Sequence, residues 1–345
     1  MSDNAAIRDC ECITGSGRAA GGGVYVSYHN KNTEFTMSGH AVIENCKVTA
    51  SSQNSWTKSY GGGVLVSSRS SLTLKDQAAI RKCSAENTAG GATYGGGIFA
   101  EGSLTIAGLA EVDKDCSAAV GSGIYMEVGS DFIVSQNLYA NGGVIAGEVV
   151  LNSASKHGAT LTITGSDEGV TEFKGSVLNN GGTIEKGKFT GEVTNNGSIT
   201  GGEFSREVTN NKTISGGAFS GTVINGEGGT IAESVSITKL EFVVTFDNEG
   251  TKTTETIAKG VKLTAPTTQA KEGYRFDGWY DVDDNKITET STFEASVVDL
   301  NAKWVLQTVI TFTAEGGTIN GEATKSIDAG TAIGTLPTAT IDVAG

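Results

Sequence analysis

A glycine run followed by three apolar or aromatic residues occurs four times within the first 126 residues of the chain, at 21–26, 61–66, 95–100 and 121–126. The first copy reads Gly-Gly-Gly-Val-Tyr-Val, and the fourth begins Gly-Ser-Gly. A unit this short cannot bury its own apolar face, so successive copies must stack on one another. The repetition therefore predicts an elongated β-solenoid, a type of fold that usually serves as a surface or a spacer.

Two further apolar positions follow each glycine strand. A second strand has apolar first and third residues and recurs at 35–37, 72–74, 104–106 and 132–134. The third position is Ile43, Ile80, Val112 and, in the fourth copy, Ala140. Alternate residues of a strand share one face. The pattern therefore predicts an all-β fold, a parallel β-helix with three strands per rung, over residues 1–140.

The overall composition limits the partners of the chain. Glycine accounts for 49 of 345 residues and proline for only 2, which indicates tight turns between strands and excludes collagen. The net charge of −14 leaves no basic patch that could release counterions from nucleic acid or anionic lipid. We therefore expect no nucleic-acid partner. The chain also contains no apolar run of about 18 residues, so we expect no membrane insertion.

Four of the five cysteines share one position of the repeat. Cys10, Cys46 and Cys83 each follow the third apolar position by three residues, and Cys116 follows it by four. One thiol per rung predicts a column of small buried side chains. Metal ligation is the alternative, but it needs several ligands around one point, and the histidines do not share this phase. We expect no metal and no cofactor.

The residue after the third apolar position alternates in charge from rung to rung. It is Arg8, Glu44, Arg81 and then Asp113. Parallel stacking would place these side chains about 4.8 Å apart, each beside opposite charges. We expect this column to fix the register of the rungs from outside the core. The alternative interpretation is a catalytic carboxylate pair formed by Asp113 and Asp115.

The segments that lead from each cysteine to the next glycine run differ in length. They span 47–60, 84–94 and 117–120, and this variation predicts loops on one side of the solenoid. Three aromatic residues lie in these loops: Trp56, Tyr60 and Tyr94. Exposed rings could form a platform that binds sugar rings or a protein partner. The alternative is that the rings fold back and cover the glycine-rich turns.

Residues 141–236 continue as a solenoid with shorter rungs, and from Val193 onward the period is 15 residues. One apolar side chain per strand predicts a three-sided coil with a narrow core. We expect the asparagine amides to form a hydrogen-bonded ladder and interpret these residues as left-handed corners, with the glycine pairs 201–202 and 216–217 at a second corner. The repeated positions are Val177, Val193, Val208 and Val223; Asn179, Asn195, Asn210 and Asn225; Ile184, Ile199 and Ile214; and Phe189, Phe204 and Phe219.

Residues 237–305 have the composition of a compact domain, with seven aromatic residues that could form a core. The motif Gly-Tyr-x-Phe-x-Gly-Trp-Tyr at 273–280 is followed by Ala-Lys-Trp at 302–304. This segment resembles the Listeria-Bacteroides repeat, also called the internalin B-repeat. The resemblance implies a small β-grasp-like fold, used in tandem on bacterial surface proteins as a non-catalytic spacer or interaction module.

Two details of this module have alternative interpretations. We interpret Trp279 as a core residue, the alternative being a ligand contact. Residues 281–285 read Asp-Val-Asp-Asp-Asn, which is similar to the start of a calcium loop. The glycine and the distant glutamate of an EF-hand are missing, however. A solvated hairpin turn is therefore the preferred interpretation.

Residues 306–345 start a second copy of the module, with Val-Ile-Thr-Phe at 309–312, and end where the aromatic motif should follow. Residues 6–10 match 79–83, so the chain also begins within a rung. Both ends predict that this chain is a piece excised from a longer protein. We expect the piece itself to lack the signal peptide and the anchor. Residues 1–140 also resemble, more loosely, the right-handed β-helix repeats of bacterial surface and autotransporter-like adhesins.

These observations favour a non-enzymatic stalk or adhesin segment, extracellular and on the bacterial cell surface, that attaches to a glycan or a host surface protein. We expect no catalytic residues. The alternative is a carbohydrate-active β-helix, a polysaccharide lyase or a glycoside hydrolase. Such an enzyme needs acids, or a base beside calcium-binding acids, that converge in one groove. The sequence of the long-rung loops shows no such cluster.

Overall fold

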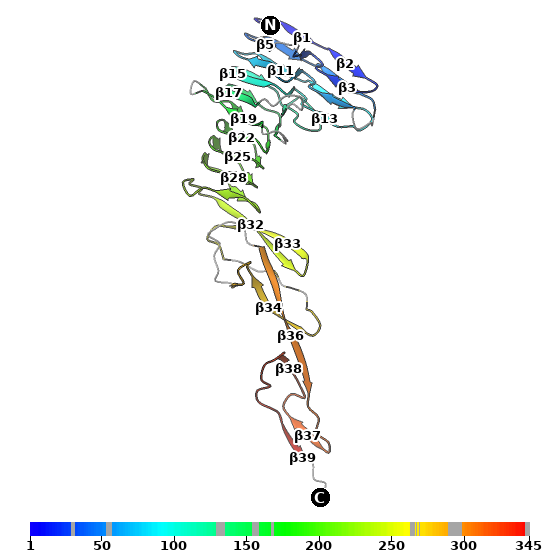
Figure 1. Cartoon of the computed structure of the whole chain (residues 1–345), viewed down its shortest axis with the longest axis vertical. Coiled ribbons are helices and arrows are strands. Elements are labelled where there is room, and N and C mark those ends of the chain that lie inside the picture. The colour runs from blue at the N-terminus through cyan, green and yellow to red at the C-terminus, as the bar shows by residue number, and fades with distance from the viewer. Residues whose placement is uncertain are drawn as a thin grey trace. The chain divides into compact units, whose positions relative to one another are not determined.

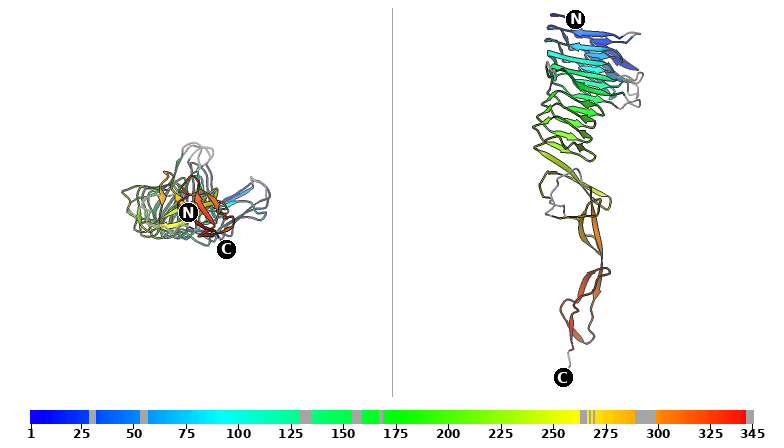
Figure 2. Two further views of the ribbon diagram at one scale, coloured as in Figure 1. Left: turned by 90° about the horizontal axis from the view of Figure 1, so that it is seen from below. Right: turned by 60° about the vertical axis from the view of Figure 1, so that its left-hand side comes forward.

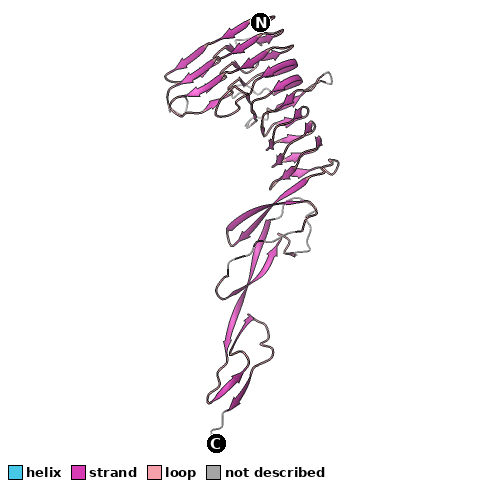
Figure 3. Ribbon diagram, turned by 180° about the vertical axis from the view of Figure 1, so that it is seen from behind, coloured by secondary structure: helices cyan, strands magenta, loops and turns pink. Residues whose placement is uncertain are grey.

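The computed structural model describes residues 1–28, 32–52, 57–128, 135–153, 159–166, 169–262, 266, 268, 270–288 and 299–341. Across these residues the regular elements are all strands (Figure 3). The chain divides into two compact units, Met1–Glu241 and Phe242–Gly345. The finer boundaries near residues 140, 236 and 305 stay predictions.

The unit Met1–Glu241 is a parallel β-helix whose rungs stack through three columns of strands (Figures 1 and 2). In the column that follows the glycine runs, corresponding strands pair without a shift, so that Ile98 lies between Val64 and Ile124. The predicted fold class is confirmed. The first column, which follows the glycine runs, contains β4 (Val24–Val26), β9 (Val64–Val66), β14 (Ile98–Ala100), β16 (Ile124–Glu127), β18 (Val149–Asn152), β21 (Val177–Asn180), β24 (Val193–Asn195), β27 (Val208–Asn210) and β30 (Val223–Asn225).

The second and third columns share one sheet, because β15 and β17 run through both. The second column contains β5 (Glu34–Met37), β10 (Ser71–Leu74), β15 (Ser103–Val112), β17 (Gln136–Ile145), β19 (Leu161–Thr164), β22 (Thr183–Ile184), β25 (Ser198–Ile199), β28 (Thr213–Ile214) and β31 (Thr230–Ile231). The third contains β1 (Ala6–Arg8), β6 (Val42–Glu44), β11 (Ala79–Arg81), β20 (Glu172–Phe173), β23 (Lys188–Phe189), β26 (Glu203–Phe204) and β29 (Ala218–Phe219), together with the second halves of β15 and β17.

The first rungs contain two more strands than the sequence predicted. The described parts of the segments 47–60 and 84–94, interpreted as loops, contribute four strands to two small parallel side sheets. Their apolar pattern is weak because the buried positions include Thr57, Ser59 and Thr93, and Ser59 donates a hydrogen bond to the Glu86 carbonyl at 2.6 Å. One side sheet contains β2 (Glu11–Thr14), β7 (Lys47–Ala50) and β12 (Ser84–Asn87), and the other β3 (Arg18–Ala20), β8 (Lys58–Tyr60) and β13 (Thr93–Tyr94).

The fourth rung has a different alignment from the one predicted. Leu138 pairs with Leu104, and Ile145 pairs with Val112, so Ala140 occupies the second column and is not the third apolar position. Residues 132–134, expected as the second strand, lie outside the described residues. Spacing from the glycine run misleads here because the connection between β16 and β17 is longer than in the preceding rung.

The cysteine column lies inside the β-helix, as predicted. Cys46, Cys83 and Cys116 are buried in the main core, and Cys10 is half-buried beside it. The Cys83 thiol donates to the Arg81 carbonyl at 3.3 Å. A hydrogen bond with the Cys116 thiol raises the pKa of Cys83 to about 12. These thiols therefore act as small neutral core side chains.

The asparagines of the short rungs form the predicted ladder, but their corner interpretation is wrong. Asn179 donates to Asn195, Asn195 to Asn210 and Asn210 to Asn225, at 2.8, 2.8 and 2.7 Å. All four are strand residues that point inward and are at most 1% exposed. Their backbones are not left-handed; among the described residues that conformation occurs instead at positions such as Asn45.

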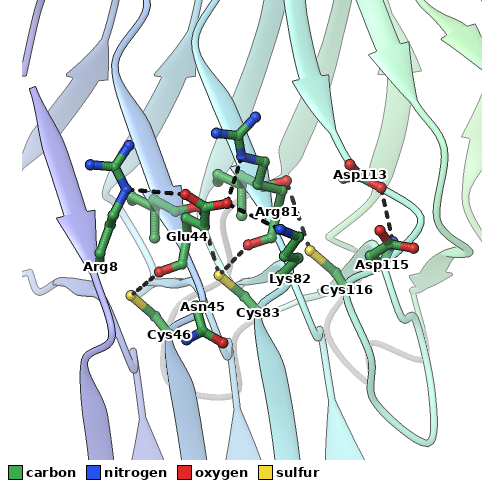
Figure 4. A network of polar contacts seen from close by, with 12 residues as sticks. Arg8, Glu44, Asn45, Cys46, Arg81, Lys82, Cys83, Asp113, Asp115 and Cys116 are labelled. Carbon is green, nitrogen blue, oxygen red and sulfur yellow. Dashed lines mark hydrogen bonds and ion pairs between the residues drawn. The ribbon is translucent and has the colours of Figure 1, made fainter. Parts of the chain in front are cut away.

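The alternating charge column is confirmed for its first three members (Figure 4). Glu44 forms ion pairs with Arg8 at 3.0 Å and with Arg81 at 3.1 Å, and Lys82 lies 3.4 Å from the same carboxylate. Asp113 departs from the pattern, because its carboxylate accepts a hydrogen bond from the Asp115 backbone at 3.0 Å. The register column therefore ends at Arg81, because Asp113, the acid of the next rung, forms its hydrogen bond within a local turn.

Arg81→Glu should lower the melting temperature in low-salt buffer, because a carboxylate would then replace one of the cations around Glu44. High salt should shrink the difference through screening. Lys114→Glu is the control: Lys114 is exposed, and its ion pair is with its neighbour Asp115. Equal shifts for the two variants in thermal melts would contradict a register role.

Glu44 also gives this column a pH dependence. A hydrogen bond from Arg8 is the main cause that holds the pKa of Glu44 below its ordinary value. A lowered folded pKa contributes stability above the ordinary value, about 4.3, that is lost as pH falls through the folded pKa. The melting temperatures of the wild type and of Glu44→Gln should therefore differ at pH 7 and converge in acid.

The unit Phe242–Gly345 has a small aromatic core. Trp279 is 4% exposed and meets Phe246 edge-on at 5.0 Å between ring centres, so its interpretation as a core residue is confirmed. Phe242, Val244 and Leu300 are buried too. The strands are β32 (Leu240–Asn248), β33 (Thr251–Ala258), β34 (Tyr274–Tyr280), β35 (Lys286–Ile287), β36 (Asp299–Thr311), β37 (Gly317–Asn320), β38 (Thr324–Asp328) and β39 (Thr338–Ile341).

Candidate functional site

The glycine runs bring each rung back from the side sheets to the first column. Gly61, Gly95 and Gly121 have φ of 64–65°, and a Cβ on Gly62 would lie 2.4 Å from the Ser84 backbone. Glycine is therefore required both for the turn and for the close approach of two chain segments. This geometry places Tyr60, the residue before the run, against the outward face of the first column.

The outward face of the first column carries a cluster of four aromatic rings. Phe99 and Tyr125 belong to β14 and β16, and Tyr60 and Tyr94 reach over them from β8 and β13. Tyr60 stacks on Tyr94 at 5.7 Å and meets Phe99 edge-on at 4.6 Å. Tyr94 lies 4.9 Å from Tyr125. We call Tyr60, Tyr94, Phe99 and Tyr125 the aromatic cluster.

The structure brings two of the three predicted ligand-binding residues together. Tyr60 and Tyr94 are half-buried, so each presents part of its ring to solvent, while Phe99 and Tyr125 beneath them are 0% and 6% exposed. Trp56 lies outside the described residues. The two tyrosines thus cover the outward strand face and also form an outer ring surface, which leaves their role in binding a prediction.

Two cations border the aromatic cluster. The Arg18 guanidinium lies 4.4 Å from the centre of the Tyr60 ring, and Lys58 lies 5.6 Å from that of Tyr94. Cations near ring faces are attracted by the ring quadrupole. Burial raises the pKa of Tyr60 to about 12, so its hydroxyl stays protonated and can donate a hydrogen bond at neutral pH.

Two carboxylates occupy neighbouring rungs beside the same rings. Glu101 and Glu127 each follow the apolar triplet of their rung, so the pairing of β14 with β16 places them side by side. Glu101 forms an ion pair with Arg18 at 3.6 Å. Burial, followed by the charge of Glu101, raises the pKa of Glu127. The Tyr125 hydroxyl links this acid to the next rung, since it lies 3.5 Å from Glu127 and accepts a hydrogen bond from Asn152 at 2.9 Å.

Glu127→Gln should raise the melting temperature at pH 7. A raised folded pKa means that the charged carboxylate lowers stability once pH exceeds the folded pKa, and glutamine removes that charge. A gain of about 1 kcal/mol would appear as about 2–4 °C in a thermal melt. The difference should disappear in acid, where the carboxyl group is protonated.

The matched control for this prediction is Glu101→Gln. This substitution also removes one carboxylate, but it breaks the ion pair with Arg18. We therefore expect a smaller gain or none. If Glu101→Gln stabilised the protein as much as Glu127→Gln, mutual repulsion and not burial would control the site.

The sequence interpretation missed Arg18, Glu101 and Glu127. The two acids do have a sequence signal, because each is the first polar residue after a glycine-run strand. Arg18 has none, since only the pairing of β3 with β8 places it over Tyr60. Among the described residues, no group of three or more His, Cys, Asp or Glu side chains is arranged to hold a metal ion.

This arrangement combines the groups that recognise sugars. Ring faces stack on apolar sugar faces, and carboxylates and cations bind hydroxyl and acidic groups. The pair Glu101 and Glu127 could also act as general acid and base, because the environment raises the pKa of one of them. The geometry therefore supports a binding surface. The pair Glu101 and Glu127 is the part of this surface that could take part in acid–base catalysis.

The second unit carries the motif identified in the sequence. Its strand β34 pairs antiparallel with β36, so that Phe276 lies opposite Trp304. Residues 242–303 match the family model of the Listeria-Bacteroides repeat domain. This segment is a Listeria-Bacteroides repeat. The presence of the Listeria-Bacteroides repeat indicates a bacterial surface-associated protein.

The turn at 281–285 of the Listeria-Bacteroides repeat is a hairpin turn, as predicted. It joins β34 to β35, which pair antiparallel. The Asp281 carboxylate accepts hydrogen bonds from the backbones of Asp283 and Asn285 at 3.0 and 2.8 Å. These bonds lower the pKa of Asp281, that from Asn285 most strongly. The Asp281 carboxylate thus stabilises the hairpin turn through hydrogen bonds within it.

No curated protein matches the chain in sequence. In the part of the chain that the structure describes, no helix has the length and hydropathy needed to cross a bilayer.

Proposed function

We propose that this chain is a non-enzymatic stalk or adhesin segment of the bacterial cell surface and that its aromatic cluster attaches to a glycan or to a host surface protein. The observation that carries the proposal is the Listeria-Bacteroides repeat at 242–303, in the same chain as a β-helix with the half-buried tyrosines Tyr60 and Tyr94. The ladders of the β-helix support a spacer role, because each rung is fixed by its neighbours.

Surface location is tested on the bacterium that makes the protein. Antibodies raised against the purified chain should label intact cells as strongly as permeabilised cells, and external protease should remove the signal. A cytoplasmic protein serves as the control for cell integrity. Labelling that requires permeabilisation would overturn the surface assignment.

Attachment is tested with beads that carry the full chain, applied to a glycan array and to host cells. Tyr94→Ala should reduce retention at least tenfold, because it removes one of the two outer rings. Tyr139→Ala is the matched control: this tyrosine is 38% exposed but belongs to β17 in the second column. Equal retention of the two variants would exclude the aromatic cluster as the attachment surface.

A second candidate function is hydrolysis or elimination on a polysaccharide. The observation that favours it is the pair Glu101 and Glu127, because glycosidases use two carboxyl groups of different pKa. Polygalacturonate or mucin glycans should then yield new reducing ends, and Glu127→Gln should abolish their release. Release that persists in this variant would point to a contaminating enzyme, and no release would support the non-enzymatic proposal.

A further inference from the structure

A row of asparagine side chains follows the first column of strands on the outside of the β-helix. Asn152 pairs in register with Asn180, and Asn196 and Asn211 continue the row through hydrogen bonds of 2.8 Å each. The first three are half-buried and Asn211 is exposed, so each presents part of its surface to solvent. We call Asn152, Asn180, Asn196 and Asn211 the amide row.

The hydrogen bonds along the amide row leave part of the amides unused. An asparagine amide has two N–H donors and an oxygen with two lone pairs. The Asn196 amide donates one hydrogen bond to Asn180 and accepts one from Asn211, so a second N–H and a second lone pair remain. The row therefore offers donors and acceptors, repeated from rung to rung, to a ligand that lies along the stack.

The amide row is continuous with the aromatic cluster. Asn152 donates to the Tyr125 hydroxyl at 2.9 Å, and the Tyr125 ring lies 4.9 Å from that of Tyr94. The strands that carry these residues pair in the order β16, β18, β21, β24 and β27. At about 4.8 Å per rung, they extend over roughly 19 Å of the stack. A ligand that uses the whole surface must therefore be a chain and not a single sugar.

The surface beside the amide row determines the charge of a suitable ligand. The outward residues of successive strands are Leu178, Thr194 and Thr209, which stack in register and are half-buried. Neither this row nor the amide row has a charged side chain. Exposed charges of both signs flank the two rows and give no net charge: Glu192, Glu207, Arg206 and Lys212. An ionic ligand therefore gains no overall attraction, whereas an uncharged polar chain meets donors and acceptors.

We propose that the aromatic cluster and the amide row together bind an uncharged, linear polysaccharide whose chain runs along the β-helix. This inference rests on the proposed attachment to a glycan and specifies the form of that glycan. A sugar face stacks on the tyrosine rings, and hydroxyls of the following sugars donate to amide oxygens and accept from amide N–H groups. A hexose in an extended β-linked chain is similar in length to one rung spacing, about 4.8 Å, so successive sugars can meet successive amides.

The test is calorimetric titration of the full chain with cello-, manno- and N-acetylchito-oligosaccharides of two and six sugars. In at least one series the hexasaccharide should bind at least tenfold more tightly than the disaccharide, because only the longer chain reaches from the aromatic cluster onto the amide row. Asn196→Leu should weaken hexasaccharide binding at least fivefold and leave disaccharide binding unchanged. Asn137→Leu is the matched control: this asparagine is also half-buried but belongs to β17 in the second column, so the variant should bind as the wild type does.

The other outcomes separate this inference from the proposed function. Equal affinity for disaccharide and hexasaccharide would overturn the extended site, and a loss in Tyr94→Ala would then leave attachment by the aromatic cluster alone. Tighter binding of hexagalacturonate than of every neutral hexasaccharide would exclude an uncharged ligand. Retention on host cells without binding of any oligosaccharide would indicate a protein partner, which overturns the inference but not the attachment.

The variant itself also decides. Unchanged hexasaccharide binding by Asn196→Leu would exclude the amide row as part of the site. If this variant fails to fold in a thermal melt, Asn211→Ala takes its place with the same expected loss, because Asn211 is exposed.

Discussion

Phe204→Ala should lower the free energy of unfolding by about 3–5 kcal/mol, the range for a buried phenylalanine. Phe204 is 2% exposed in the third column. Its ring stacks between Phe189 at 4.7 Å and Phe219 at 4.8 Å, with planes within 8° of parallel. The narrow core offers few side chains that could move into the space. Removal of one ring therefore leaves a cavity and breaks two stacking contacts.

Urea denaturation followed by circular dichroism measures this loss. Hydrogen exchange should show reduced protection in the rungs on both sides of Phe204, because each rung is stabilised mainly by its neighbours. Glu203→Ala, at the adjacent outward position, is the control and should change stability by less than about 0.5 kcal/mol. Phe204→Leu retains part of the volume and should fall between the two. A loss below about 1 kcal/mol for Phe204→Ala would show that the stack does not hold the short rungs together.

Asn195→Leu should lower the free energy of unfolding by about 2–4 kcal/mol, although leucine has a similar shape. The Asn195 amide donates to Asn210 at 2.8 Å and to the Thr213 carbonyl at 3.1 Å, and its oxygen accepts from Asn179 at 2.8 Å. Leucine would take the donor away from the buried Asn210 oxygen and one acceptor away from the Asn179 amide. The cost arises from the remaining polar groups and not from lost volume.

A second asparagine ladder provides a matched control for this substitution. Asn211 donates to Asn196 and Asn196 to Asn180, each at 2.8 Å. These side chains point outward, so water can replace the lost bonds, and Asn196→Leu should cost less than about 1 kcal/mol. Equal losses for Asn195→Leu and Asn196→Leu in urea denaturation would contradict the importance of burial.

The inner ladder has an end, and this gives a further comparison. The rung before Asn179 has Leu151 at the same position, and in the described chain the Asn179 oxygen has no hydrogen-bond partner. Asn179→Leu would extend the apolar column by one rung and remove this unpaired acceptor. Its cost should therefore be smaller than that of Asn195→Leu.

Much of the fold could be predicted because the chain repeats. A period of 15 residues specifies which side chains lie above one another, so Phe189, Phe204 and Phe219 had to form one column once the strands were parallel. The cysteine column follows in the same way. The motif at 273–280 identified the Listeria-Bacteroides repeat through its residue types and their spacing.

The predictions of the fold were wrong where the repeat changes, and where the outcome depends on the direction in which a side chain points. The fourth rung was misaligned because an insertion precedes β17. The side sheets were missed because polar residues occupy several of their buried positions. Asparagine fits both a corner and a ladder, so its presence in the sequence does not say whether Asn195 points inward. Asp113 has the expected charge but turns to its own backbone.

The candidate sites depended on tertiary structure to a greater degree. Tyr60 and Tyr94 could be selected from the sequence as aromatic residues in variable segments. The contact of Tyr60 with Arg18, and the position of both tyrosines beside Glu101 and Glu127, could not, because Arg18 and the two acids belong to different rungs and meet only through the stacking of rungs.

The repeats in the sequence were enough to predict the β-helix and its columns, because periodic side chains must meet when rungs stack in register, and the motif at 273–280 was enough to identify the module at 242–303. The folded chain was needed to show which repeated polar groups are buried, which strands leave the main stack, and where charges from different rungs converge. Periodicity defines which residues are neighbours along the stack. Burial and charge depend also on the direction of each side chain and on what packs around it.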